Sequence, residues 1–206
     1  MKTVIKFVIC IIEIIVIMIL VSMFSANEKE KASSEDIIFQ EQELNDSGEI
    51  EYFSFFELNN RDRYYTVLDC VNKYIEYCKD KDKTTLINLL DNQYKEENNI
   101  KESNVLEYIH KLEETNEVSV NKIYVQNLSD NCTEYYVEMV LQNVKEEPFG
   151  SEDDVFVRYK TTKEYIGDSN VTIRVDFQNN TFSVIPNGYV TDKNGNLEKF
   201  ESVKGE

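Results

Sequence analysis

The stretch VTIRVDFQNNTFSV, residues 171–184, decides the fold. In residues 171–177 apolar side chains alternate with polar ones, which is the period of a β-strand with one buried face. Asn179-Asn180 is a turn dipeptide, and the alternation resumes behind it. The stretch therefore predicts an antiparallel β-hairpin, whose apolar face needs a second layer to pack on.

The residues upstream of this hairpin show the same two-residue period. They predict further antiparallel strands at Val118 to Val125 (with a change of phase), Tyr135 to Leu141 and Val155 to Tyr159. Breaks are expected where turn-forming residues gather, at 129–131, in the loop through 148–154 and at 167–170.

Helical periodicity precedes the strands. Between Arg61 and Lys79 the apolar residues recur at steps of three and four, which predicts one long helix. A second helix is expected to bury Leu86, Leu89, Leu90 and Tyr94. A third is expected to begin at Asn104, with Glu107 completing a capping box, and to bury Val105, Leu106, Ile109 and Leu112. The fold class is therefore α+β, with three helices packed on one face of a curved antiparallel sheet.

This order of elements resembles the nuclear transport factor 2-like (cystatin-like) superfamily over residues 61–187. The resemblance rests on YYTVLDCVNKY at residues 64–74 and on LINLLD at residues 86–91, which look like the opening of many anchored extracytoplasmic domains of bacteria with AT-rich genomes. It implies a cone in which the helices lie in the concavity of the sheet. It implies no single activity, because the superfamily hosts isomerases, dehydratases, binding modules and secretion-channel scaffolds.

Residues 4–24 are apolar apart from three positions, Lys6, Glu13 and Ser22. As a helix this run is about 31 Å long, which matches the hydrocarbon core of a bilayer. Residues 1–26 are therefore expected to form a cytoplasmic N-terminus and a single transmembrane helix, which places the rest of the chain outside the cytoplasm at the cell membrane. The alternative is a signal peptide cleaved after Ala26, but Phe24 would then occupy a position that favours small residues.

Glu13 lies near the middle of this apolar run. In one interpretation it contacts a polar group on a partner helix or on a second copy of the chain. In the other it is a protonated acid that the surrounding Ile and Val residues make tolerable. Both interpretations remain open.

Composition divides the rest of the chain into three parts. Residues 27–60 are acidic and polar, which is typical of a solvated tether, but they contain an aromatic segment at residues 50–58. That segment is expected to dock on its own domain, with recognition by a partner as the alternative. Residues 61–187 are expected to form the α+β domain, and residues 188–206 a polar C-terminal tail.

The net charge of −17 excludes one class of partner. A surface so acidic repels the phosphates of nucleic acids, so no nucleic-acid partner is expected. The charge favours basic partners and cations, or serves solubility alone.

The cysteine spacing gives no sign of a metal or redox motif. Cys70 and Cys78 would lie about 12 Å apart along a helix, too far for a disulfide. Cys132 is expected either to pair with one of them or to be, like them, a free thiol. The sequence contains no Cys-x-x-Cys, so a zinc ribbon or a thioredoxin-like site is not expected.

No catalytic, cofactor-binding or metal-binding residue is assigned. His110 is the single histidine, and without a second His or a nucleophile beside it we interpret it as a residue on a helix flank. Asp192, Asn194 and Asn196 resemble a calcium loop, but the glycine is misplaced, so the segment is interpreted as a turn. The acidic run at 152–154 is interpreted as a solvated hairpin end.

These observations favour a non-enzymatic interaction or scaffold domain of an envelope or secretion-type assembly. Glu13 and the aromatic segment at 50–58 are its candidate contacts, with a protein partner or with a second copy of the chain. The alternative is a small-molecule-binding domain that uses the pocket of the cone, and an isomerase or dehydratase is the least favoured. A pocket of roughly 300 Å³ or more with one buried carboxylate would favour these alternatives.

Overall fold

The computed structural model describes residues 37, 39, 41–112, 115–149 and 158–203. The transmembrane helix predicted at residues 1–26 lies outside this part of the chain, as do Glu13 and the acidic run at 152–154, and the structure gives that helix no support. None of the described helices is long and apolar enough to cross a membrane. Residues 39–206 form one compact unit, and the fold below is that of its described part.

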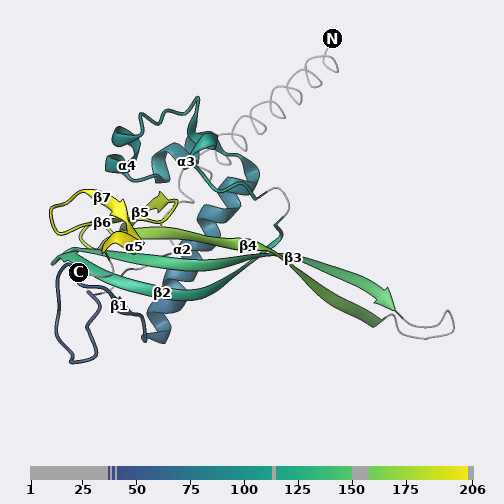
Figure 1. Ribbon diagram of the computed structural model, residues 1–206, viewed down its shortest axis with the longest axis horizontal. Helices are drawn as coiled ribbons and strands as arrows, with labels where there is room; N and C mark the ends of the chain where they lie inside the picture. The colour runs from purple at the N-terminus through teal and green to yellow at the C-terminus, as the bar shows by residue number, and fades with distance from the viewer. Residues whose placement is uncertain (1–36, 38, 40, 113–114, 150–157, 204–206) are drawn as a thin grey trace, which may run out of the picture. The chain divides into compact units, whose positions relative to one another are not determined.

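A five-stranded antiparallel sheet, with its strands in chain order, forms the centre of the unit (Figure 1). The strands are β1 (Phe56–Glu57), β2 (Glu117–Ser129), β3 (Cys132–Phe149), β4 (Arg158–Asp176) and β5 (Thr181–Pro186). The predicted hairpin is confirmed as β4 and β5, with Val171, Ile173 and Val175 fully buried. The predicted phase change in the first long strand is confirmed as an irregularity in β2 between Val120 and Lys122.

The long predicted helix is confirmed as α2 (Arg61–Asp80), which packs against the sheet. The Asn60 side chain caps its first turn by accepting hydrogen bonds from the backbone N–H groups of Asp62 and Arg63. Lys81 ends the helix in the left-handed conformation. The buried stripe of α2 consists of Arg63, Val67, Cys70, Val71, Tyr74, Ile75 and Cys78.

The second predicted helix is divided into α3 (Lys83–Leu89) and α4 (Asn92–Glu97). Leu90 is extended, because it forms an isolated bridge with Val184 at the edge of the sheet. Asp91 then caps α4. A sheet contact therefore overrides the helical pattern at one residue.

The third predicted helix is wrong, because only a single 3-10 turn, η1 (Val105–Glu107), forms there. The Asn104 side chain accepts the Lys101 N–H and makes no cap for this turn. The apolar residues of the segment are nevertheless inside, since Val105, Ile109 and Leu112 are buried. This segment lies against α3. Its apolar residues are spaced in the sequence as they would be in a helix, although its backbone is irregular.

The expectation of helices on one face of the sheet, in the manner of a cone, is also wrong. Residues 189–203 are not a loose tail but form β6 (Tyr189–Thr191), β7 (Leu197–Lys199) and α5 (Phe200–Val203). Val190 and Phe200 pack with Tyr136, which lies on the face of β3 opposite to the face that packs on α2. The sheet is therefore covered by α2 on one face and by the C-terminal elements on the other.

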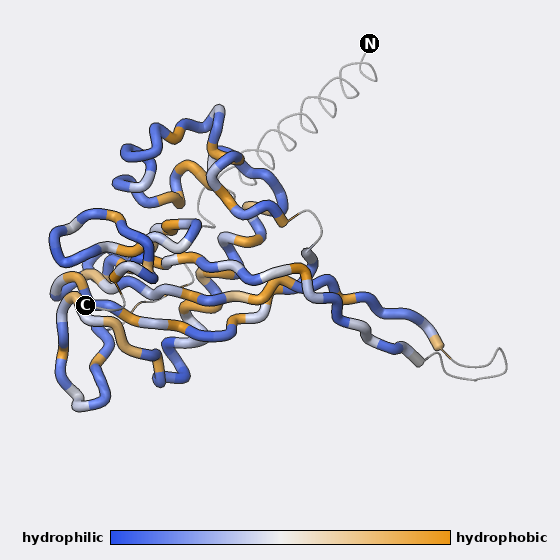
Figure 2. The backbone as a smooth tube through the Cα atoms, viewed as in Figure 1, coloured by the Kyte–Doolittle hydropathy of each residue, from blue (hydrophilic) through white to orange (hydrophobic). Residues whose placement is uncertain are grey.

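The strands β3 and β4 are longer than predicted. β3 continues through Pro148, and β4 is uninterrupted through residues 167–170, where the sequence predicts a break. The paired residues 143–149 and 158–164 project from the sheet, and together with Tyr165 at their base they are called the arm below (Figure 1). Figure 2 shows that the arm is mostly polar, whereas apolar residues concentrate in the middle of the sheet.

Candidate functional site

The arm begins where β2 begins. Glu117 pairs with Gln142, and beyond this point β3 pairs with β4 alone within the described residues. Its ladder runs from the pair Asn143 and Glu164 to the pair Phe149 and Arg158. A two-stranded ribbon without a packed face is marginally stable by itself. Packing in the hydrophobic core therefore gives no reason for the chain to form this arm.

Three aromatic side chains of the arm are exposed to solvent. Phe149 is 52% exposed, Tyr159 60% and Tyr165 62%, and the last two are the most exposed large hydrophobic residues of the described chain. Aromatic side chains with few degrees of freedom are the residues that most often dominate the energy of protein interfaces. The arm therefore has the composition of a binding element.

Charged residues protect the edges of the arm. Lys145 lies 3.7 Å from Glu164, and Lys163 lies 2.6 Å from Glu117. Pro148 removes one backbone donor from β3 near its end. Such residues oppose the addition of a further strand to an open edge. Recognition through the aromatic side chains is therefore favoured over strand addition.

Asn116 fixes the place where the arm starts. Its side-chain amide donates to the Val144 carbonyl at 2.7 Å, and its side-chain oxygen accepts the Val144 N–H at 2.6 Å. The carboxamide thus replaces the next residue that β2 would have contributed to the ladder. It satisfies the edge of β3 at Val144 and ends the three-stranded part of the sheet there.

The aromatic segment at 50–58 docks on its own domain, as predicted. Phe56 pairs with Val125 through β1, and the Phe53 N–H donates to the Asn127 carbonyl at 3.0 Å. The ring of Phe55 lies 5.0 Å from that of Phe200 in an edge-to-face arrangement. Most of the segment is therefore part of the fold and is not a free recognition peptide.

The acidic stretch before this segment is also attached to the domain. The carboxylate of Glu43 lies 2.6 Å from the guanidinium of Arg63, and both side chains are buried. Burial raises the pKa of Glu43 above its ordinary value, although the Arg63 charge opposes this shift. Four apolar residues around this attachment, Leu44, Ile50, Tyr52 and Phe53, stay 40–53% exposed.

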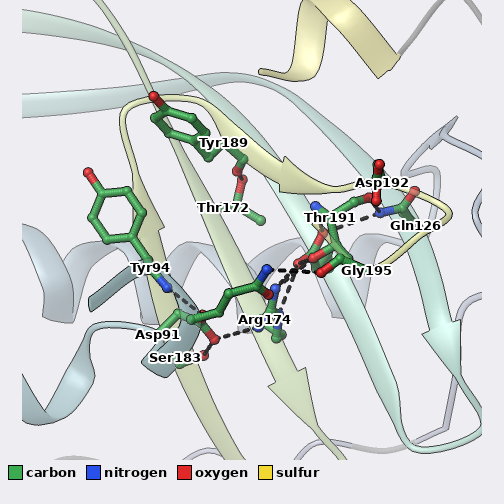
Figure 3. A network of polar contacts seen from close by, with 12 residues as sticks. Asp91, Tyr94, Gln126, Thr172, Arg174, Ser183, Tyr189, Thr191, Asp192 and Gly195 are labelled. Carbon is green, nitrogen blue, oxygen red and sulfur yellow. Dashed lines mark hydrogen bonds and ion pairs between the residues drawn. The ribbon is translucent and has the colours of Figure 1, made fainter. Parts of the chain in front are cut away.

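A buried polar network joins α4, β3, β4 and β6 (Figure 3). Its centre is Arg174, whose guanidinium lies 2.5 Å from an Asp91 oxygen and 2.8 Å from a Glu134 oxygen. Thr191 donates its hydroxyl and its backbone N–H to Glu134, at 2.6 and 3.0 Å. The neighbouring carboxylates outweigh the effect of burial and raise the pKa of Arg174.

This network is structural. Glu134 is completely buried, and its two oxygens accept hydrogen bonds from Arg174, Thr191 and Gln126. Asp91 is 5% exposed and uses its second oxygen to cap α4. Neither carboxylate is placed to take up a proton from a substrate, because each is occupied within the protein. The network holds the C-terminal layer against the sheet.

His110 follows η1 and is not on a helix. Its Nδ1 lies 3.1 Å from the Tyr74 hydroxyl, and it forms a further hydrogen bond with the Asn170 backbone. Burial lowers the pKa of His110 to about 4, so the ring is neutral at pH 7. It links α2 to β4 through these two hydrogen bonds, and its backbone contacts the protonated Cys78 thiol.

The three described cysteines, Cys70, Cys78 and Cys132, are free thiols. Burial raises the pKa of Cys70 and Cys78 to about 12 and that of Cys132 to about 11. They are therefore protonated at neutral pH. Among the described residues no group of His, Cys, Asp or Glu side chains is arranged to hold a metal ion. Asp192 accepts the N–H groups of Asn194 and Asn196, which confirms the predicted turn.

No family model, curated protein or solved structure matches this chain. Nothing in these comparisons identifies a nuclear transport factor 2-like domain.

The arm is the feature that sequence reasoning missed. Pro148 and Gly150 are typical of a loop and hide the continuation of β3. The run from Tyr159 to Thr162 carries a signal of strand, since aromatic and β-branched residues favour strands. That signal alone does not show that the strands leave the body of the domain.

Proposed function

We propose that this chain is a non-enzymatic protein-interaction module and that the arm is its binding element. The observation that carries the proposal is the exposure of Phe149, Tyr159 and Tyr165 on a ribbon that buries no apolar face of its own. A partner that covers these rings would bury aromatic surface at no cost to the core. A non-enzymatic role is further supported by the buried carboxylates of Glu134 and Asp91, which are engaged with Arg174.

The apolar run at residues 4–24 supports a location at the cell membrane, with the module outside the cytoplasm. An arm on a membrane-attached domain would reach a protein partner of the same envelope. Participation in an envelope or secretion-type assembly is therefore part of the proposal.

Site-specific photo-crosslinking in intact cells tests the proposal. A photoreactive phenylalanine analogue is placed at position 159 or 165, and each adduct is identified by mass spectrometry. Tyr65 is the matched control, because it is also a tyrosine and 50% exposed but lies on α2. We expect one discrete protein adduct from both arm positions and none from position 65.

Two further results bear on the proposal. The exchange Tyr159→Ala should weaken adduct formation from position 165 by about tenfold or more, as for an aromatic residue at the centre of an interface. Absence of a discrete adduct from the arm, or the same adduct from position 65, would refute the assignment of the arm.

A further inference from the structure

A second exposed apolar surface lies at the end of the sheet opposite to the arm (Figure 1). It is called the apolar patch below and consists of Leu44, Ile50, Tyr52 and Phe53, whose side chains are 40–53% exposed. The patch borders the turn between β2 and β3, because the Tyr52 hydroxyl donates to the Asp130 carboxylate. From beside this turn β3 runs for 18 residues into the arm, roughly 60 Å of extended chain. The apolar patch is therefore distinct from the arm.

The loop that carries the patch is closed on itself. The Asn45 N–H donates to the Glu49 carbonyl at 3.0 Å, and the Asn45 side-chain oxygen accepts the N–H groups of Ser47 and Glu49, both at 3.0 Å. Because Asn45 and Glu49 face each other, the next residues outward, Leu44 and Ile50, lie on neighbouring segments of chain. Two apolar residues that are separated in the sequence are thereby brought together at one place.

Asn127 of β2 holds this loop against the sheet. Its buried side-chain amide donates to the Glu43 carbonyl at 2.9 Å and to the Glu51 carbonyl at 3.3 Å, so it closes the base of the loop. The Asn127 backbone carbonyl accepts the Phe53 N–H at 3.0 Å. Phe53 takes the left-handed conformation, with a φ of 54°, which is rare for a bulky residue. The sheet therefore presents the apolar patch in a fixed shape, and a partner pays little to order this loop.

The charged residues around the patch are acidic. Every charged residue between positions 32 and 60 is an Asp or a Glu. Within the described part of the chain, none of the exposed carboxylates of Glu41, Asp46, Glu49, Glu51 and Asp130 forms an ion pair. Two basic side chains that contact this segment are each engaged with another of its acids, Arg63 with Glu43 and Lys122 with Glu57. The patch is thus an apolar surface with an uncompensated negative rim.

We propose that the apolar patch binds a basic amphipathic segment of a partner protein. Apolar side chains of that segment cover Ile50 and Phe53, and its Lys or Arg side chains lie against the carboxylates of Glu49 and Glu51. An exposed apolar patch with a polar rim is a common mark of a protein-interaction site. Charge complementarity selects this occupant, because an anionic lipid surface or a second copy of this acidic chain would be repelled at the same place.

The proposal does not depend on the partner of the arm. A chain with both surfaces can join two proteins that lie at opposite ends of its sheet, so the domain acts as a bridge.

The test uses the full chain in phosphatidylcholine nanodiscs, with empty nanodiscs as the blank. The probes are two pools of short fluorescent peptides with the same Leu and Phe content, in which the remaining positions are Lys in one pool and Glu in the other. Fluorescence anisotropy at physiological ionic strength measures binding. We expect saturable binding of the Lys pool and none of the Glu pool.

Two double variants with the same change in net charge decide whether the acidic rim forms the site. Glu49→Gln with Glu51→Gln should weaken binding of the Lys pool by about fivefold or more, as expected for the loss of two rim contacts. Glu76→Gln with Glu96→Gln, at exposed positions of α2 and α4, is the matched control and should leave binding unchanged. Because all four positions are exposed, both variants keep the fold.

The apolar half of the site is tested by Ile50→Ser with Phe53→Asn, since asparagine tolerates the left-handed conformation at position 53. This variant should weaken binding about tenfold while circular dichroism shows an intact fold, and Tyr65→Ser on α2 is the control. Replacing residues 145–162 by Asn-Gly removes the arm and should leave binding unchanged.

Four results would each overturn the proposal. They are no binding of the Lys pool, equal binding of the two pools, equal weakening in the two charge variants, and loss of binding with the arm removed.

Discussion

The ring of Phe200 stacks on that of Tyr136, with centroids 3.8 Å apart and an angle of 14° between the planes. Phe200 is 1% exposed although it lies only a few residues from the C-terminus. The contact joins the C-terminal layer to the first part of β3. It makes residues 189–203 an integral part of the fold.

Phe200→Ala should therefore destabilise the protein strongly. Removing a fully buried phenylalanine lowers the free energy of unfolding by about 3–5 kcal/mol. Urea denaturation followed by circular dichroism measures the change. Glu198→Ala, at an exposed position of β7, is the control and should change the free energy by less than about 0.5 kcal/mol. Equal stability of the two variants would contradict the packing described for this layer.

Arg174→Met should be similarly harmful, because it leaves the carboxylates of Glu134 and Asp91 buried without their cation. We expect a loss of about 3–5 kcal/mol in the free energy of unfolding. Arg61→Met removes the same charge at an exposed position and serves as the control. If the double variant Arg174→Met with Glu134→Gln is no more stable than Arg174→Met alone, the uncompensated charge is not the cause.

His110 makes stability depend on pH in a predictable direction. Its pKa is about 4 in the folded protein and 6.5 ordinarily, so the unfolded chain binds more protons between these values. The contribution of His110 to the free energy of unfolding is present above pH 6.5 and is lost as the pH falls toward 4. Between pH 7 and pH 5.5 the loss should be about 1 kcal/mol.

His110→Gln is the control for this pH dependence. The chain has no other histidine, so the slope between pH 7 and pH 5.5 should disappear in the variant. Glu43 acts in the opposite direction, because burial raises its pKa and its protonation therefore favours the folded state as the pH falls. Glu43→Gln should consequently increase the loss of stability at pH values below this window. Denaturation curves at several pH values measure both effects.

The arm should be dispensable for folding. Replacing residues 145–162 by Asn-Gly joins Val144 to Lys163, which already face each other in the ladder, through a two-residue hairpin turn. Because the described side chains of the removed part, at 145–149 and 159–162, are exposed or half-exposed, we expect the free energy of unfolding to change by less than about 1 kcal/mol. A loss of several kcal/mol in urea denaturation would mean that the arm supports the core.

Membrane attachment is predicted to depend on residues 4–24. The full chain should remain in the membrane pellet after extraction with alkaline carbonate, and a variant that lacks these residues should be released. A full-length chain recovered free in solution, or a mature product that starts beyond Ala26, would contradict the proposed location.

The sequence predicts correctly those elements in which the spacing of the apolar residues matches the one face that packs against the rest of the protein. The helix from Arg61 and the hairpin at 171–184 are both correct, because their apolar residues face a single layer. The prediction fails where a distant residue decides the local conformation. Leu90 leaves the helical conformation because Val184 pairs with it, and the helix expected at Asn104 is replaced by an irregular segment.

Burial of polar residues explains the largest error. Glu134, Thr172 and Arg174 have the polar character of a solvent-facing strand surface, so the sequence predicts one covered face. In the structure Arg174 satisfies Glu134, and Thr172 donates to the Tyr189 carbonyl at 2.7 Å. Only the position of the C-terminal segment shows that these residues are inside.

The two hydrogen bonds between the Asn116 side chain and the Val144 backbone have a mechanical consequence. They set one fixed position at which a sheet covered on both faces becomes a bare two-stranded ribbon. Ile166, an extra residue in β4 at nearly the same level, interrupts the regular ladder there. We therefore expect bending of the ribbon to concentrate at this junction, because beyond it neither a third strand nor a packed layer stiffens the two strands.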